Sequence, residues 1–264
     1  MSQTSMSTNF SLGIAGAWAT SAPGKVLSGP ALENIEFGRM VAYGTSQGIR
    51  KPLQNSLDVV FSADLVTSNV INGSIKVRQI GQTSFTNTAL TATTFASDHA
   101  TTMAAIATKI EAITGVADCT VGGSNSRTLL ITATEGYEIE IGTTDFVVTL
   151  GGSQATVTYV RGSDDTIIGV ALHENKEKNS DGTALYESGD AVNVAYQGEV
   201  WMLAQDTVLI NDSVYAAFVG STAERGEVRN TADSAPVEAI AVSGARFRSA
   251  ASADGLVRVE FNQP

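Results

Sequence analysis

The chain has 264 residues with a formal net charge of −11, and 43% of the residues are hydrophobic against 16% charged. This composition is typical of a globular protein large enough for one big domain or two smaller ones. The acidic balance, with no cluster of Lys and Arg, argues against nucleic acid or an anionic membrane as a partner. The single cysteine, Cys119, excludes an intrachain disulfide and a zinc site built from several cysteines.

Most of the chain is predicted to form short strands separated by turns. Asn72-Gly73 within 69–80 is a strong hairpin signal, and "GGS" at 151–153 suggests a second hairpin. The sequence is rich in Thr, Val and Gly, which suits pleated sheets and their turns. The predicted strands after the first hairpin are 127–134, 145–150, 154–160, 166–172, 190–196, 199–204, 236–243 and 256–262.

One segment, 97–115, carries the periodicity of a helix instead. Ser97 is the expected N-cap, Asp98 lies in the first turn, and Gly115 is the expected residue after the helix end. The helix is expected to bury one apolar face. That face consists of Met103, Ile106, Ile110 and Ile113.

The order of elements predicts a mainly β protein with an inserted module. Residues 67–160 are Thr-rich and contain strands, the helix and further strands, so we expect a compact α+β unit there. The flanking segments, 1–66 and 161–264, are predicted to form one outer β-domain that resembles a barrel or sandwich. An insertion at a loop tip leaves both cores intact when its two ends lie close together.

The segment "YESGDAVNVAYQGEVW" (186–201) is predicted to form a scaffold hairpin with its turn at Gln197-Gly198. Val192 and Val194 share one face of the first strand, and Val200 and Met202 share one face of the second. Alternation of this kind indicates a structural wall and not a catalytic surface.

No pattern for catalysis, cofactor binding or metal binding emerges. His99 and His173 are expected to be solvent-exposed, and neither has a metal-ligand spacing to another His or Cys. Cys119 is expected to be a buried, unreactive thiol. The stretch 21–29 lacks the first Gly and the hydroxyl residue of a phosphate loop. The acids in 179–190 lack the ligand pattern of a calcium loop. We therefore predict no enzyme activity and no cofactor.

Three stretches resemble the structural cement, or head decoration, proteins of tailed bacteriophages. They are 186–201, "GPALENIEFGRMVAYG" (29–44), where Glu36 stands at the position of the usual Pro, and the C-terminal stretch 244–264. The resemblance covers 1–66 and 161–264, and residues 67–160 are a departure from it. It implies a protein that binds the assembled phage head at seams between major capsid proteins and stabilises it, as a homo-oligomer (dimer or trimer) on the outer surface of the virion.

The N-terminal stretch fits such a role and lacks the basic start of a secretory signal, so we expect synthesis in the host cytoplasm. It is nearly uncharged and too short to form a core, which suits an arm that becomes ordered on a neighbour. The alternative is an edge strand packed on its own domain. The candidate capsid contacts are Phe10, Leu12, Ile14 and Trp18.

Two other functions remain open at this point. The first is a virion surface module that binds host carbohydrate or receptor, which exposed aromatic side chains on 67–160 would favour. The second, less favoured, is a glycosidase, which would need a pocket that joins two carboxylates.

Overall fold

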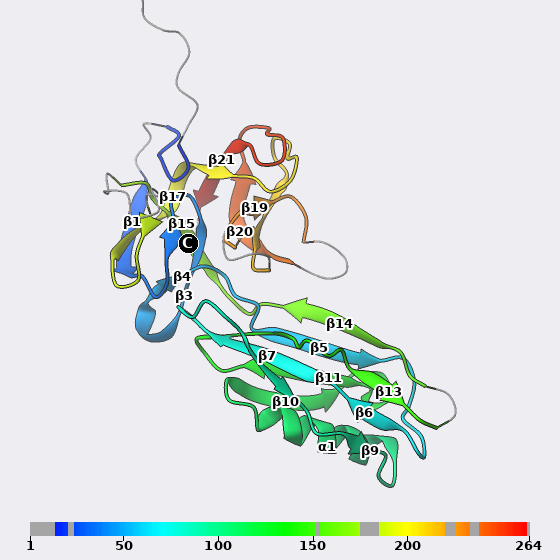
Figure 1. The fold of residues 1–264 in the computed structure, drawn as a ribbon. Coiled ribbons are helices and arrows are strands. Elements are labelled where there is room, and N and C mark those ends of the chain that lie inside the picture. Colours follow the sequence, from blue (N-terminus) through cyan, green and yellow to red (C-terminus); the bar gives the residue numbers. More distant parts are fainter. Residues whose placement is uncertain are drawn as a thin grey trace, which may run out of the picture.

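The computed structural model describes residues 14–20, 24–151, 154–174, 185–219, 225–232 and 238–262. These residues form two lobes (Figure 1). We call the lobe that contains β1–β4 and β15–β21 the outer lobe, and the elongated lobe that contains β5–β14 and α1 the module. The predicted fold class, mainly β with one long helix, is confirmed.

The outer lobe is built on a nine-stranded, curled antiparallel sheet. Its strand order is β19-β18-β20-β21-β17-β15-β3-β4, and β1 also pairs with β17. The strands are β1 (Lys25–Pro30), β3 (Met40–Tyr43), β4 (Ile49–Arg50), β15 (Ile167–Ala171), β17 (Ala191–Leu203), β18 (Ser213–Ala217), β19 (Val228–Arg229), β20 (Ala239–Phe247) and β21 (Leu256–Asn262). A separate pair is formed by β2 (Ile35–Glu36) and β16 (Leu185–Tyr186), and a 3-10 turn, η1 (Thr45–Gln47), precedes β4.

The sheet is curled, and its two edge strands bridge to residues that directly follow β1 and β17. Ala31, directly after β1, bridges to Ile49 in the edge strand β4. Ala204, directly after β17, bridges to Val228 in the opposite edge strand β19. Closing a sheet in this way covers strand edges that would otherwise be exposed.

Strand β17 is a single strand of 13 residues, so the predicted hairpin at Gln197-Gly198 is wrong. Up to Gln197 the strand pairs with β1, and from Gln197 onward it pairs with β21. Gly198 lies inside the strand with a φ of +125°, which a residue with a side chain rarely adopts. The predicted alternation is confirmed, because Val192 and Val194 lie in one apolar cluster and Val200 and Met202 in another.

The module packs one helix and three small sheets around its own core. The sheet orders are β10-β11-β5-β14, β12-β7-β8 and β13-β6-β9. The elements are β5 (Ser56–Phe61), β6 (Val70–Asn72), β7 (Ser74–Gln79), β8 (Thr86–Ala89), β9 (Thr93–Thr94), α1 (His99–Glu111), β10 (Val116–Gly122), η2 (Ser124–Ser126), β11 (Thr128–Ala133), β12 (Tyr137–Ile141), β13 (Val147–Thr149) and β14 (Val157–Gly162). One cluster of buried apolar residues, from Leu57 to Ala155, joins these sheets to the helix.

Helix α1 buries the predicted face but differs from the prediction at both ends. Met103, Ile106, Ile110 and Ile113 are all buried. The N-cap is Asp98 and not Ser97, since the Asp98 carboxylate accepts a hydrogen bond from the Thr101 amide at 2.8 Å. The helix ends at Glu111, and Gly115, with a φ of +94°, lies in the turn that leads into β10.

Neither hairpin predicted in this region forms. Asn72 ends β6 and Gly73 separates it from β7, yet the two strands belong to different sheets. Gly73 is required by packing, because a Cβ at this position would lie 2.8 Å from the Phe146 ring. Strands β13 and β14, on either side of "GGS", also pair with different partners, β6 and β5. Residues 152–153 of that motif lie outside the described residues.

Strand pairing favours wider limits for the module than the predicted 67–160. Strand β5, before residue 67, pairs with β11 and β14, and Ser56 lies opposite Gly162. The alternating apolar residues of β5 look like those of any outer strand, so the sequence contained no sign of this boundary. We therefore propose Ser56–Gly162 as the module, with its two ends side by side as an insertion requires.

Candidate interaction surface

The N-terminal segment lies along β17 as an additional edge strand. The Gly16 amide donates to the Trp201 carbonyl at 2.7 Å, and the Trp201 amide donates to the Ala17 carbonyl at 2.9 Å. The Ala19 amide donates to the Glu199 carbonyl at 2.8 Å. Residues 14–20 thus belong to the outer lobe, whereas the candidate contacts Phe10 and Leu12 lie outside the described residues.

Trp18 covers two glycines where β17 changes partners. A Cβ added to Gly24 would lie 2.1 Å from the Trp18 ring, and one added to Gly198 would lie 2.6 Å from it. The ring therefore rests directly on the backbone at both positions. Even so, Trp18 is 38% exposed and Ile14 is 58% exposed. We call these two side chains the N-terminal patch.

Replacing Gly198 with alanine is expected to lower the free energy of unfolding by roughly 1–3 kcal/mol, because the alanine is strained at this φ and displaces Trp18. Urea denaturation followed by fluorescence would measure the change. Gly189→Ala is a matched control, since Gly189 has a φ of +94° but a Cβ there would meet nothing within 4 Å. Equal losses in the two variants would show that the Trp18 contact contributes nothing.

A second pair of exposed apolar side chains lies on the module. Leu150 is 64% exposed with a φ of 60°, and Val66 is 41% exposed. The buried side chain of Asn69 holds both segments, since its amide donates to the Leu150 carbonyl at 2.6 Å and its oxygen accepts from the Val66 amide at 2.8 Å. We call Val66 and Leu150 the module patch.

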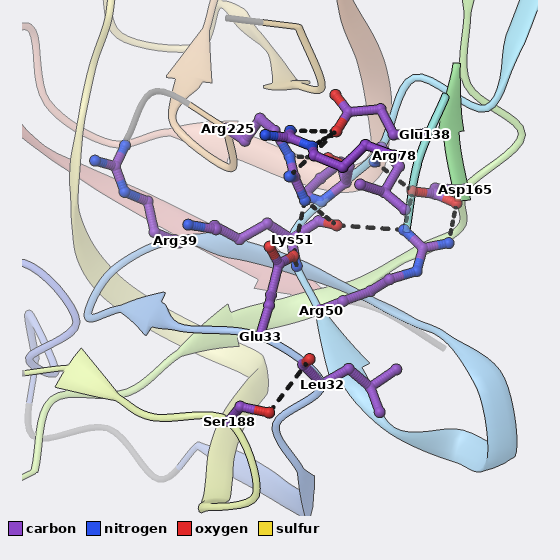
Figure 2. A network of polar contacts seen from close by, with 12 residues as sticks. Leu32, Glu33, Arg39, Arg50, Lys51, Arg78, Glu138, Asp165, Ser188 and Arg225 are labelled. Carbon is purple, nitrogen blue, oxygen red and sulfur yellow. Dashed lines mark hydrogen bonds and ion pairs between the residues drawn. The ribbon is translucent and has the colours of Figure 1, made fainter. Parts of the chain in front are cut away.

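A buried network of charges joins the module to the outer lobe (Figure 2). Arg225 of the outer lobe is fully buried and donates to the Glu33 carboxylate at 2.7 Å and to the Pro52 carbonyl at 2.9 Å. On the other side its guanidinium lies 3.7 Å from the carboxylate of Glu138, in β12 of the module. Glu138 also pairs with Arg78 of β7. A buried charge is tolerated only when it is paired in this way.

The chain passes between the two lobes twice, and the two connecting segments are joined by hydrogen bonds next to this network. The Arg50 guanidinium donates two hydrogen bonds to the Asp165 carboxylate, of 2.5 and 2.6 Å. The same carboxylate accepts from the Leu53 amide at 2.8 Å and from the Asn55 side chain at 3.3 Å. Residues that enter and leave the module are therefore held by one side chain, which fixes how the lobes are oriented to each other. None of these residues was predicted from the sequence to be functional.

The histidines take part in structure. His99 differs from expectation, because its side chain is largely buried, its Nδ1 accepts from the Leu65 amide at 2.8 Å, and its Nε2 lies 3.0 Å from the Ser126 carbonyl, to which it donates. The ring of His173 lies 4.8 Å from that of Phe37. Both side chains thus have structural contacts.

The remaining candidate groups are also accounted for by structure. Cys119 is buried, and burial raises the pKa of its thiol to about 12, as expected for an unreactive cysteine. Asp190 caps a turn by accepting from the Glu187 amide, and Asp181 lies outside the described residues. Among the described residues, no group of three or more His, Cys, Asp or Glu could hold a metal ion. No helix in that part of the chain is long and apolar enough to cross a membrane.

A cleft of about 270 Å³ next to the lobe junction contains two carboxylates, those of Glu135 and Asp165, but the Asp165 carboxylate is already bound by Arg50, Leu53 and Asn55. A cleft of about 770 Å³ in the module is lined by Arg78, Lys109 and uncharged residues, with no Asp or Glu. The aromatic side chains of 67–160, which a carbohydrate- or receptor-binding surface would need to expose, pack in or against the module core or under the Arg78 guanidinium. They are Phe85, Phe95, Tyr137, Phe146 and Tyr159.

Comparison with known proteins points to one family. The family model described as "Structural cement protein (E217 gp24/Pam3 gp6)" matches residues 121–262, more than half of the chain. A solved chain from "The capsid of Myoviridae Phage XM1" is similar over 98% of this chain and 96% of that chain, at 14% identity and a TM-score of 0.46. No curated protein matches. The match includes 186–201 and most of 244–264, two of the stretches that carry the resemblance, but it also includes 121–160, so the predicted departure does not extend over the whole of 67–160. Because the match covers more than half of the chain, the chain belongs to the structural cement protein family of phages.

Proposed function

We propose that this protein binds the assembled phage head at seams between major capsid proteins and stabilises the shell without catalysis. The observation that carries the proposal is the buried charge network between the lobes. A protein that bridges two subunits resists their separation only if its own two halves keep a fixed orientation. A buried joint whose charges are paired provides this, whereas a flexible linker would not.

The two apolar patches supply candidate attachment points at the two ends of such a bridge. The N-terminal patch lies on the outer lobe, and the module patch lies on the module. Exposed apolar side chains on a rigid backbone lose little entropy when they become buried on a partner. We further propose a location on the outer surface of the virion, as a homo-oligomer, with no nucleic acid or membrane partner.

Removing residues 1–13 is expected to leave the melting temperature nearly unchanged and to reduce occupancy of the shell. The truncation removes Phe10 and Leu12 but keeps the hydrogen bonds of residues 16–19 to β17. Each large apolar side chain fully buried on a partner contributes ~1.5–3 kcal/mol to binding. Titration of both proteins onto shells that lack this protein would measure the change.

The control is Ile210→Ser, which removes an apolar side chain that is 57% exposed from a loop of the outer lobe. Removing residues 1–20 should, in contrast, also lower the melting temperature, because it takes Trp18 off the backbone of Gly198. Full occupancy by the protein that lacks 1–13 would show that the N-terminal arm is not a capsid contact.

A further inference from the structure

Within the described part of the chain, one face of the four-stranded sheet in the module presents exposed apolar side chains. Strands β10, β11, β5 and β14 lie side by side in one sheet of the module (Figure 1). Their alternate residues on one face enter the module core with α1. The strand register brings Thr120, Leu130, Asp58 and Val160 into one row across the opposite face. We call this the outer sheet face. Leu130 and Val160 are 37% and 44% exposed.

The outer sheet face carries negative charge and no positive charge. Of the residues that the four strands point outward, the charged ones are Asp58 and Asp118. Arg161 of β14 points the other way, since it lies opposite Leu57 and pairs with Glu140 and Glu238. The rest of the face consists of Thr, Ser, Val, Leu and Gly.

Asp58 occupies an unfavourable position in the middle of this face. It lies directly between Leu130 and Val160 on the neighbouring strands. Within the described residues its carboxylate makes no hydrogen bond or ion pair. Partial burial raises the pKa of Asp58 above its usual value. Ionised Asp58 therefore lowers the free energy of unfolding, because its carboxylate is better solvated in the unfolded chain. A cation from another molecule could pair with this carboxylate, because it has no partner within the described residues.

We propose that the outer sheet face binds a protein surface that presents a Lys or Arg surrounded by small apolar side chains. The cation would pair with Asp58, while Leu130 and Val160 would become buried around the pair. A second copy of this chain fits poorly, because two identical faces would bring acids together without a cation. The proposal rests on the proposed shell binding and specifies one surface through which that binding occurs.

The test uses the full chain and shells that lack this protein. Asp58→Asn keeps the shape of the side chain and removes its charge, and should weaken binding by about tenfold or more. The same variant should melt at the wild-type temperature or above it, because a poorly solvated carboxylate has been removed. Loss of binding without loss of stability separates a contact from a folding defect.

A matched pair of variants at one position tests whether the partner surface is positively charged. Thr158 is exposed on the same face, on the edge strand β14 next to the row of Asp58. Thr158→Lys should weaken binding to the shell, whereas Thr158→Glu should bind as tightly as the wild type or more tightly. The wild-type interaction should also weaken as salt is raised, because salt screens the attraction.

The outcomes are distinguishable. If the wild type does not bind shells, the proposed function itself is wrong. If the wild type binds and Asp58→Asn and both Thr158 variants bind equally well, the outer sheet face is not a binding surface. If the Lys and Glu variants weaken binding alike, the partner is not basic. If Asp58→Asn changes only the sedimentation of the free protein, the occupant is a second copy and the proposal fails.

Discussion

Arg225→Met is expected to destabilise the protein by roughly 3–5 kcal/mol, the usual cost of breaking a buried ion pair from one side. The substitution removes the hydrogen bond of Arg225 to Glu33 and leaves that carboxylate, which is 6% exposed, with the Lys51 amide as its remaining donor. Glu138 keeps Arg78. Chemical denaturation would measure the loss. Scattering from the native variant should also show a wider range of lobe orientations.

Two further variants test whether the unpaired Glu33 charge causes the loss of stability in Arg225→Met. The double variant Arg225→Met, Glu33→Gln should recover most of the loss, because a neutral amide replaces the unpaired charge and its oxygen can still accept from Lys51. Arg248→Met breaks an ion pair with Glu260 whose side chains are 39% and 36% exposed, and should cost about 0–1 kcal/mol. If Arg225→Met costs no more than Arg248→Met, the network does not hold the lobes together.

Replacing residues 56–162 with a short Gly/Ser linker is expected to leave a folded outer lobe that unfolds cooperatively. Ser56 and Gly162 are paired across two antiparallel strands, so the linker needs to span only about 5 Å. The tie between Arg50 and Asp165 remains. The variant loses the hydrogen bonds that the module donates to the Gln54 and Asn55 carbonyls, so a lower melting temperature is expected.

The narrower replacement of residues 67–160 is the matched comparison, and should give insoluble protein. It keeps β5 but removes β11 and residues 157–160 of β14, the two strands on either side of it. An isolated apolar strand with two open edges is prone to aggregation. Soluble expression and circular dichroism of both variants would test this. If the 56–162 variant fails to fold while the 67–160 variant folds, the proposed module limits are wrong.

The sequence was most informative where a pattern depends on neighbours in the chain. The buried face of α1 follows from a spacing of three and four residues, and the alternation along β17 from a spacing of two, so both predictions were correct. Glycine was misleading for the opposite reason. Gly73 and Gly198 suggested turns, but each has no side chain because a distant ring, that of Phe146 or Trp18, occupies the space. A glycine required by such a contact looks like a turn glycine in sequence.

The charge network could not have been predicted in the same way. Arg225 is 192 residues from Glu33, and Arg50 is 115 residues from Asp165. No spacing rule links residues so far apart, and charged side chains in a sequence normally indicate the surface. Asp58 is similar, because its position between Leu130 and Val160 depends on the register of three strands. These features come from the topology and become visible only in three dimensions.

The pairing of Ser56 with Gly162 also bears on the order in which the protein is built on the ribosome. Strands β1 and β3 pair with β17 and β15, which are synthesised more than a hundred residues later. The module, by contrast, pairs only within itself and can fold as soon as β14 has emerged. Its folding brings residues 55 and 163 together, so the long loop that the outer lobe must close becomes a short one. Folding of the inserted module thereby shortens the loop that the outer lobe must close when its last strands, β15 to β21, are synthesised.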